Sequence, residues 1–235
     1  MSLSSRYEIP QSAYAAPLEQ RLAFLRRTYV HLIGAVLAFV VLSTIFQIAG
    51  LGKWMAIMVM RSGYFWLGVI GGLSLLGWLS NALTESRRPL STQYGGLALY
   101  VLAEAIVFAP LLFLAARVDP SILPTAAGLT ILTFCGLSIY VLTSRKDFSF
   151  LGAGLCIAGL VACGLIIASI LFGFSLGVWF SAAMILLAGG AVLYSTSKAL
   201  HHFETDQYVA AALELFSAVA LLFWYVIRLL MQLRR

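Results

Sequence analysis

Seven long apolar segments determine what this chain can fold into. They lie at about 28–50, 63–83, 95–116, 122–142, 150–171, 175–195 and 209–230. Each is close to the roughly 20 residues that a helix needs to cross the hydrocarbon core of a bilayer. A backbone in lipid must satisfy its own hydrogen bonds, and the alternating pattern of barrel strands is absent, so the segments are expected to be helical. We therefore predict an all-α, polytopic membrane protein with seven transmembrane helices.

The composition excludes a soluble domain of this size. Of the 235 residues, 62% are hydrophobic and only 10% are charged, whereas charged residues make up about a quarter of a typical soluble chain. A net charge of +6 would suggest nucleic-acid binding in a soluble protein. Here the basic residues lie between apolar segments, where they set topology and contact anionic headgroups. The expected partner is the lipid bilayer and not nucleic acid.

The chain divides into a polar tail and one membrane domain. Residues 1–27 form the predicted N-terminal tail, which has a short amphipathic stretch near 18–25 and lacks the apolar core of a signal peptide. Residues 28–235 are predicted to form a single seven-helix transmembrane domain.

Basic residues also indicate an orientation. Most Lys and Arg residues of the tail and connectors fall on one side if the N-terminus is cytoplasmic, which predicts an integral membrane protein in this orientation. The terminal Arg234 and Arg235 would then lie outside. Either this short basic end is translocated, or the last segment is re-entrant and returns inside.

Two acidic residues lie deep within apolar segments, Glu104 in the third and Glu214 in the seventh. A charged side chain inside a membrane span is costly unless it is paired, so each is a candidate functional residue. Burial disfavours the ionised form, and such carboxyls can exchange protons near neutral pH. The alternative is that each acid is neutral or hydrogen-bonded and only holds neighbouring helices together. Arg228, in the last segment, is expected to extend to the membrane interface.

Two further motifs have weaker interpretations. His201 and His202, followed by Glu204 and Asp206, resemble a metal cluster, but adjacent histidines on a helix diverge by about 100°. A solvated, pH-responsive loop is the favoured interpretation, and neither a metal nor a cofactor is expected. The stretch 173–177, GFSLG, matches the nucleophile elbow of hydrolases, but that motif needs a strand–turn–helix context and a histidine at matching depth. We therefore predict that the protein is not an enzyme.

Stretches at the two ends of the chain carry a family resemblance. They are FLRRTY at 24–29, YST at 194–196, TDQYVAAALELF at 205–216, LF at 222–223 and RLL at 228–230. These stretches resemble the signatures of the Bax inhibitor family in its bacterial, YccA-like branch, and the similarity extends from about Leu22 onward. The resemblance implies six helices around a central seventh. It also implies a pH-sensitive calcium leak or a modulator of membrane stress and proteolysis, located in a bacterial inner (plasma) membrane.

The same resemblance implies a pair of aspartates that share a proton between the sixth and seventh spans. This chain departs from that pattern, because Ser195 stands at the first position and Ala218 at the second. Glu214 lies four residues before Ala218 and therefore on the same face of the helix. We predict Glu214, Glu104 and Ser195 as the ion- or proton-sensing residues, with no metal-ligand set.

Two functions follow from these observations. The first is a pH-modulated leak for calcium or another cation that uses buried carboxylates. The alternative is a non-conducting modulator of a membrane-anchored protease of the FtsH type, with the arginine-containing tail as the contact. An intramembrane hydrolase that uses Ser175 is disfavoured, because none of the three histidines lies deep in a span.

Overall fold

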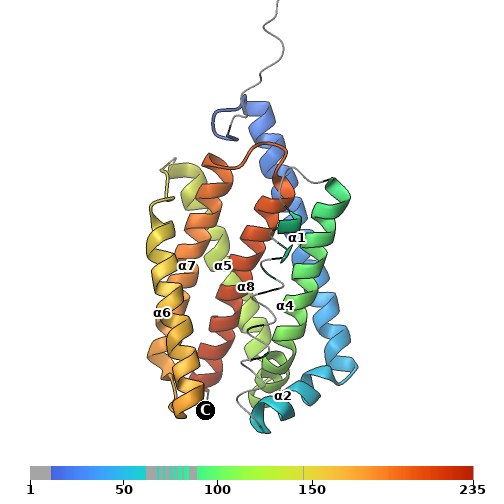
Figure 1. Ribbon diagram of the computed structural model, residues 1–235, viewed down its shortest axis with the longest axis vertical. Helices are drawn as coiled ribbons and strands as arrows, with labels where there is room; N and C mark the ends of the chain where they lie inside the picture. Colours follow the sequence, from blue (N-terminus) through green and yellow to red (C-terminus); the bar gives the residue numbers. More distant parts are fainter. Residues whose placement is uncertain are drawn as a thin grey trace, which may run out of the picture.

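A single bundle of helices makes up the computed structural model (Figure 1). The structure describes residues 12–61, 68, 71, 75, 77, 79–80, 82–84, 89–144 and 146–234. The helices of this part are α1 (Leu18–Ile48), α2 (Leu51–Arg61), α4 (Leu90–Val118), α5 (Ile122–Ser144), α6 (Leu151–Phe172), α7 (Gly177–His201) and α8 (Tyr208–Leu233). Apart from α2, all of them are long and apolar enough to cross a membrane. The predicted all-α, polytopic membrane fold is confirmed.

The observed helices differ from the predicted segments mainly at the N-terminal side. The predicted second span, 63–83, lies largely outside the described residues. Helix α1 begins at Leu18 and not near residue 28, because the amphipathic stretch continues the helix and buries Phe24 and Thr28. Residues 51–61, expected to be a connector, form the short helix α2, which buries Met55 and Ala56.

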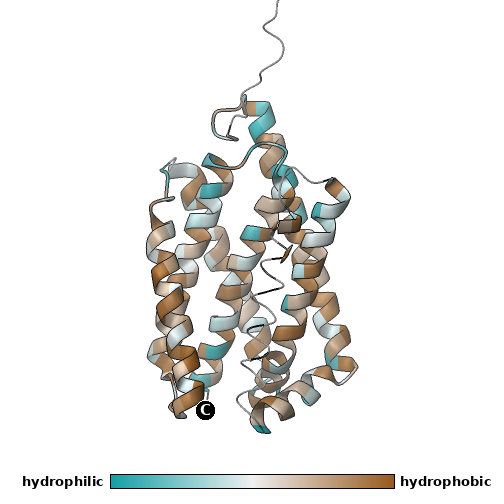
Figure 2. Cartoon of the chain, in the orientation of Figure 1, coloured by the Kyte–Doolittle hydropathy of each residue, from teal (hydrophilic) through white to brown (hydrophobic). Residues whose placement is uncertain are grey.

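The last helix, α8, lies at the centre of the bundle. It packs against α1, α4, α5 and α7 (Figure 1). In its most apolar stretch 61% of the residues are buried, compared with 6% in the peripheral helix α6. The core is therefore built around α8, and the predicted central position of the final span is confirmed. Figure 2 shows hydrophobic residues along the lengths of the helices and hydrophilic ones gathered near the end where α1 begins.

The two ends of the bundle carry different connectors. The start of α1, the α5–α6 connector and the α7–α8 connector lie at one end, and the C-terminus lies at the other (Figure 1). There the Arg234 guanidinium pairs with the Asp119 carboxylate of the α4–α5 connector and also donates a hydrogen bond to the Ser121 hydroxyl. Helix α8 runs from one end to the other without turning back, so the re-entrant alternative for the last segment is wrong.

The GFSLG stretch forms the turn between α6 and α7. Gly173 ends α6 in the left-handed conformation with φ of 73°, and Gly177 has φ of 64° where α7 begins. Ser175 therefore lies in a helix–helix turn and not in the strand–turn–helix context that a nucleophile elbow requires.

Helices α2 and α4 approach closely at Gly52. A Cβ atom there would lie 2.5 Å from Gln47 Oε1 and 2.7 Å from the Ala109 carbonyl oxygen, which accepts a hydrogen bond from Gln47 Nε2. We expect Gly52→Ala to lower the free energy of unfolding by about 1–3 kcal/mol, the usual effect of overpacking. Chemical denaturation in detergent measures it. Gly34→Ala in α1 is the control, because its added methyl group meets open space; equal effects of the two substitutions would contradict the prediction.

Candidate ion- and proton-responsive site

Glu214 has a charged partner on the neighbouring helix. It lies in the second turn of α8, and Lys198 lies in the last turn of α7. Lys198 Nζ is 3.0 Å from Glu214 Oε2 and donates a hydrogen bond of 3.2 Å to Oε1. The Glu214 side chain is 21% exposed and the Lys198 side chain 35%. Within the described part of the chain, the two form an ion pair that joins α7 to α8 in a half-buried setting.

Aromatic rings surround the ammonium group of this pair. Lys198 Nζ lies 5.7 Å from the centre of the Tyr194 ring and 5.5 Å from that of Phe203. A cation over the face of such rings is stabilised electrostatically. The positive charge of Lys198 is therefore held in place from three directions, and Glu214 supplies the only negative charge that contacts it among the described residues.

The two positions that carry aspartates in the family pattern lie beside this pair. Ser195 on α7 and Ala218 on α8 are both buried, at 5% and 3% exposure. Ser195 precedes Lys198 by about one helical turn, and Ala218 follows Glu214 by about one turn. Because α7 and α8 run antiparallel (Figure 1), both members of the ion pair are displaced in the same direction, toward the α7–α8 connector. The roles predicted for Glu214 and Ser195 remain predictions.

Glu104 lies elsewhere, on α4. It lines a hollow of about 400 Å³ between α4, α6 and α8, together with Tyr100 and Ser217. The Tyr100 hydroxyl interacts with the Glu104 carboxyl and with Ser217, which connects α4 to α8. The structure thus gives Glu104 and Glu214 separate partners. The contacts therefore do not join Glu104 and Glu214 into one proton-sharing pair. The predicted role of Glu104 remains a prediction.

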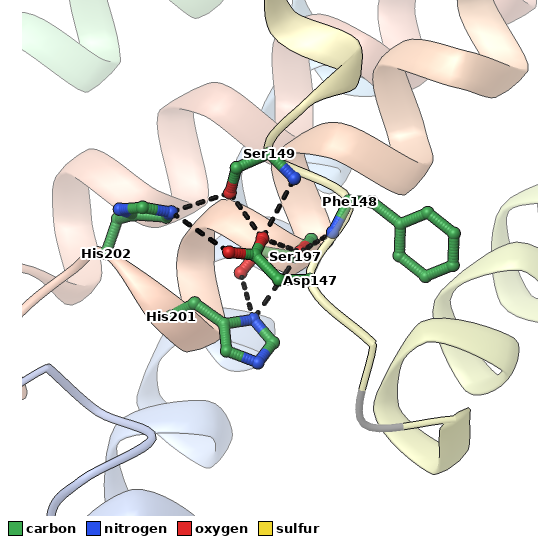
Figure 3. A network of polar contacts seen from close by, with 6 residues as sticks. All are labelled: Asp147, Phe148, Ser149, Ser197, His201 and His202. Atoms are coloured by element: carbon green, nitrogen blue, oxygen red, sulfur yellow. Dashed lines mark hydrogen bonds and ion pairs between the residues drawn. The ribbon is translucent and has the colours of Figure 1, made fainter.

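A polar network holds the connector between α5 and α6 against the end of α7 (Figure 3). Asp147 Oδ1 accepts hydrogen bonds from the Ser149 backbone N–H at 2.8 Å and from the Ser197 hydroxyl at 3.1 Å. His202 Nε2 lies 2.6 Å from the Ser149 hydroxyl and 3.7 Å from Asp147 Oδ2. His201 Nδ1 faces the backbone carbonyl of Ser197 at 3.0 Å.

The histidine pair predicted to lie in a polar loop therefore takes part in a defined network at the bundle end. In the described residues, no group of three His, Cys, Asp or Glu side chains is arranged to hold a metal ion. His201 and His202 face different partners, as expected from their divergence on a helix.

The segment before α1 covers this end of the bundle. The Ala13 backbone N–H donates a hydrogen bond of 2.8 Å to the Phe203 carbonyl, and the Ala13 side chain is fully buried. The Tyr14 ring lies 4.8 Å from the His201 ring. In α1, His31 Nε2 lies 2.8 Å from the Tyr94 hydroxyl of α4. These contacts bring the N-terminal segment close to the Lys198–Glu214 pair.

Asp147 gives the network a specific pH dependence. Hydrogen bonds from the Ser149 hydroxyl and backbone N–H lower the pKa of Asp147 from its ordinary 3.8 to about 2. Since the pKa is depressed in the folded state, the ionised carboxylate stabilises the fold fully above about pH 4, and this contribution is lost as the pH falls toward 2. We expect the difference in thermal stability between the unsubstituted protein and Asp147→Asn to stay constant from pH 8 to about 4 and to shrink below.

Thermal unfolding in detergent at a series of pH values tests this expectation. Ser149→Ala removes the largest cause of the lowered pKa, so the loss should begin at a higher pH in that variant. A difference that already disappears near pH 6 would show that another group controls the network.

Comparison with known proteins places the chain in a family. A family model described as Inhibitor of apoptosis-promoting Bax1 matches residues 21–235. The chain belongs to the Bax inhibitor family. The resemblance recognised in the sequence is therefore confirmed, and the six long apolar helices among the described residues make this member an integral membrane protein.

Relatives of the family differ in how much of the chain they match. The Modulator of FtsH protease YccA of Escherichia coli is 40% identical over 97 residues, which is 40% of this chain and 43% of YccA. A Pseudomonas aeruginosa protein is 36% identical over 104 residues, 46% of its length. The chain thus matches less than half the length of these two bacterial relatives. Mouse Protein lifeguard 4 is 29% identical over 237 residues, 97% of this chain and 93% of the relative.

Proposed function

We propose that this member of the Bax inhibitor family is a cation leak, with calcium as the ion to test, whose rate depends on the protonation of Glu214. The observation that carries the proposal is the Lys198–Glu214 ion pair between α7 and the central helix α8. It lies one turn from Ser195 and Ala218, where the family pattern has its proton-sharing aspartates. The chain keeps a carboxylate at this level of the bundle but neutralises it with a cation.

The charge state of the pair sets the electrostatic barrier for a passing cation. With Glu214 ionised the pair is close to neutral. With Glu214 protonated, Lys198 retains an uncompensated positive charge, which repels cations at short range even where solvent partly screens it. Helices α7 and α8 pack along their lengths, so the loss of one ion pair does not separate them. The leak is therefore expected to weaken as the pH falls.

Glu104 supports the proposal from a second position. It lies in the hollow between α4, α6 and α8, where a carboxylate, a phenol and a hydroxyl face a space of about 400 Å³. Of these groups the carboxylate is a ligand that calcium prefers, and Arg228 contributes a positive charge to the same hollow. In this proposal Glu104 lines the path of the ion, and the protonation of Glu214 controls the rate of the leak. We also propose that the end with the N-terminus faces the cytoplasm, as the distribution of basic residues predicts.

Calcium flux into proteoliposomes between pH 6 and 8 tests the proposed function. The protein should conduct calcium, and flux should increase from pH 6 to pH 8. Liposomes without protein provide the background rate. Flux at the background rate across the whole pH range would rule out the leak.

A second function is favoured by one relative. YccA, which is 40% identical over the part that aligns, is named a modulator of the FtsH protease. If the chain does not conduct, we propose that it binds a membrane-anchored protease of this type through its N-terminal tail. Co-purification with the protease, compared between the full chain and a variant lacking residues 1–11, measures this interaction. Equal recovery of both forms would exclude residues 1–11 as the contact.

A further inference from the structure

A second hollow lies at the end of the bundle that holds the C-terminus. Its volume is about 380 Å³, and it lies between α2, α4 and the last turns of α8. The walls are mostly apolar, with polar groups from Arg228 and Gln232 of α8. Neither the ion pair nor Glu104 lines it. The apolar lining residues that matter for the argument are Val59, Leu111, Leu114 and Met231.

Arg228 and Gln232, the two polar residues of this hollow, have hydrogen-bonding groups that could still bind a ligand. In the described part of the chain, the ion pairs use other residues, and Arg228 instead lies 6.0 Å over the Phe180 ring. Gln232 Oε1 is buried and has no hydrogen-bond partner among the described residues. A buried acceptor of this kind is normally satisfied. A ligand in the hollow would need negative charge for Arg228 and a donor for Gln232.

Two other arginines at this end are differently placed. Arg117 lies 5.3 Å over the Phe113 ring of its own helix, and Arg234 is paired with Asp119. Neither of them lines the hollow. Among the described residues that line the hollow, Arg228 is therefore the only basic one.

The depth of Arg228 fits a lipid headgroup. It lies five residues before the end of α8 at Leu233, about 8 Å along the helix axis. Guanidinium groups bind phosphate oxygens through two parallel hydrogen bonds. An acyl chain would contact the apolar walls formed by α2 and α4, which a free phosphate ion leaves unused.

We propose that this hollow binds a phospholipid whose headgroup carries one negative charge and a hydroxyl group. The phosphate accepts hydrogen bonds from Arg228, the headgroup hydroxyl donates to Gln232 Oε1, and an acyl chain lies along Val59, Leu111 and Leu114. Phosphatidylglycerol has this chemistry and is the probe. Arg228 also lines the hollow that holds Glu104, so the site is tested by lipid binding itself and not by ion flux.

Native mass spectrometry of the detergent-purified full chain tests the site by titration with defined lipids. The unsubstituted protein should bind phosphatidylglycerol about tenfold more tightly than phosphatidylcholine. Arg228→Gln should remove this preference, and the matched control Arg117→Gln should keep it. Gln232→Leu should keep the preference for negative charge but bind phosphatidylglycerol no better than phosphatidylmethanol, which lacks the hydroxyl.

Three results would overturn the proposal. One is an equal loss of phosphatidylglycerol binding in Arg228→Gln and Arg117→Gln, which indicates a diffuse attraction to basic residues. Another is complete displacement of the lipid by millimolar inorganic phosphate, which indicates an anion site only. A third is a Gln232→Leu variant that prefers phosphatidylglycerol to phosphatidylmethanol as strongly as the unsubstituted protein does. If Arg228→Gln does not fold, Arg228→Lys replaces it and should weaken phosphatidylglycerol binding, since it lacks the two-pronged geometry.

Discussion

Replacing Glu214 with glutamine is expected to lower calcium flux about tenfold at pH 8 and to remove its dependence on pH between 6 and 8. Glutamine cannot ionise, so Lys198 keeps an uncompensated positive charge at every pH. A tenfold change corresponds to roughly 1.4 kcal/mol in the barrier. That value is modest for a charge 3.0 Å from its partner, because both side chains are partly exposed and the surroundings screen them.

Calcium flux into proteoliposomes that contain Glu214→Gln tests this prediction, and Glu19→Gln is the matched control. Glu19 is exposed in the first turn of α1, at the same end of the bundle, and its substitution removes the same charge without touching the pair. Unchanged flux and an unchanged pH profile in Glu214→Gln would refute the assigned role of Glu214.

Replacing Lys198 with glutamine is expected to have the opposite effect. The Glu214 carboxylate then loses its counter-charge and attracts cations, so flux at pH 8 should rise about tenfold. Dependence on pH should persist, because the carboxyl group still exchanges its proton. The opposite signs of the two substitutions separate an electrostatic role from simple disruption of the α7–α8 contact, which would change flux in the same direction in both variants.

Lys146→Gln is the matched control for this prediction. Lys146 is exposed in the α5–α6 connector, at the same end of the bundle, so its loss changes the net charge equally. If Lys146→Gln raised the flux as much as Lys198→Gln, a general surface potential would explain the result better than the ion pair.

The fold could be predicted from the sequence to the extent that lipid imposes it. Apolar segments of sufficient length become helices because no other structure satisfies the backbone in a bilayer. The short helix α2 was missed because its 11 residues cannot span a membrane and carry Lys53 and Arg61, which are typical of a connector. Its formation depends on packing of Met55 and Ala56 against neighbouring helices, which no local pattern reveals.

The candidate site could be predicted only in part. Glu214 was identified because a lone acid in an apolar helix is costly, and this reasoning needs no partner. Lys198 is one of the basic residues near the connectors, which in a membrane protein indicate orientation and do not by themselves point to a partner for Glu214. The signal that would have found it is its position: Lys198 and Glu214 flank the connector at 202–207, where antiparallel helices bring their ends together. The exact register needed the structure.

The Asp147 network and the lipid-binding hollow were beyond sequence reasoning for a different reason. Asp147 and Ser197 are far apart in the chain and meet only because α7 runs back beside α6 and so ends next to the connector that precedes α6. The hollow at Arg228 depends on where α2 lies against α4 and α8. The sequence predicted that Arg228 extends to the interface, but not that apolar walls enclose the space beside it.

Calcium flux through the charge-exchanged variant Lys198→Glu/Glu214→Lys tests most directly whether the ion pair controls the leak. The account predicts that the double variant recovers calcium flux within about twofold of the unsubstituted protein at pH 8. The decrease toward pH 6 should also return, because a neutral pair with one ionisable carboxyl is restored. Flux that stays at the low, pH-independent level of Glu214→Gln would contradict the account.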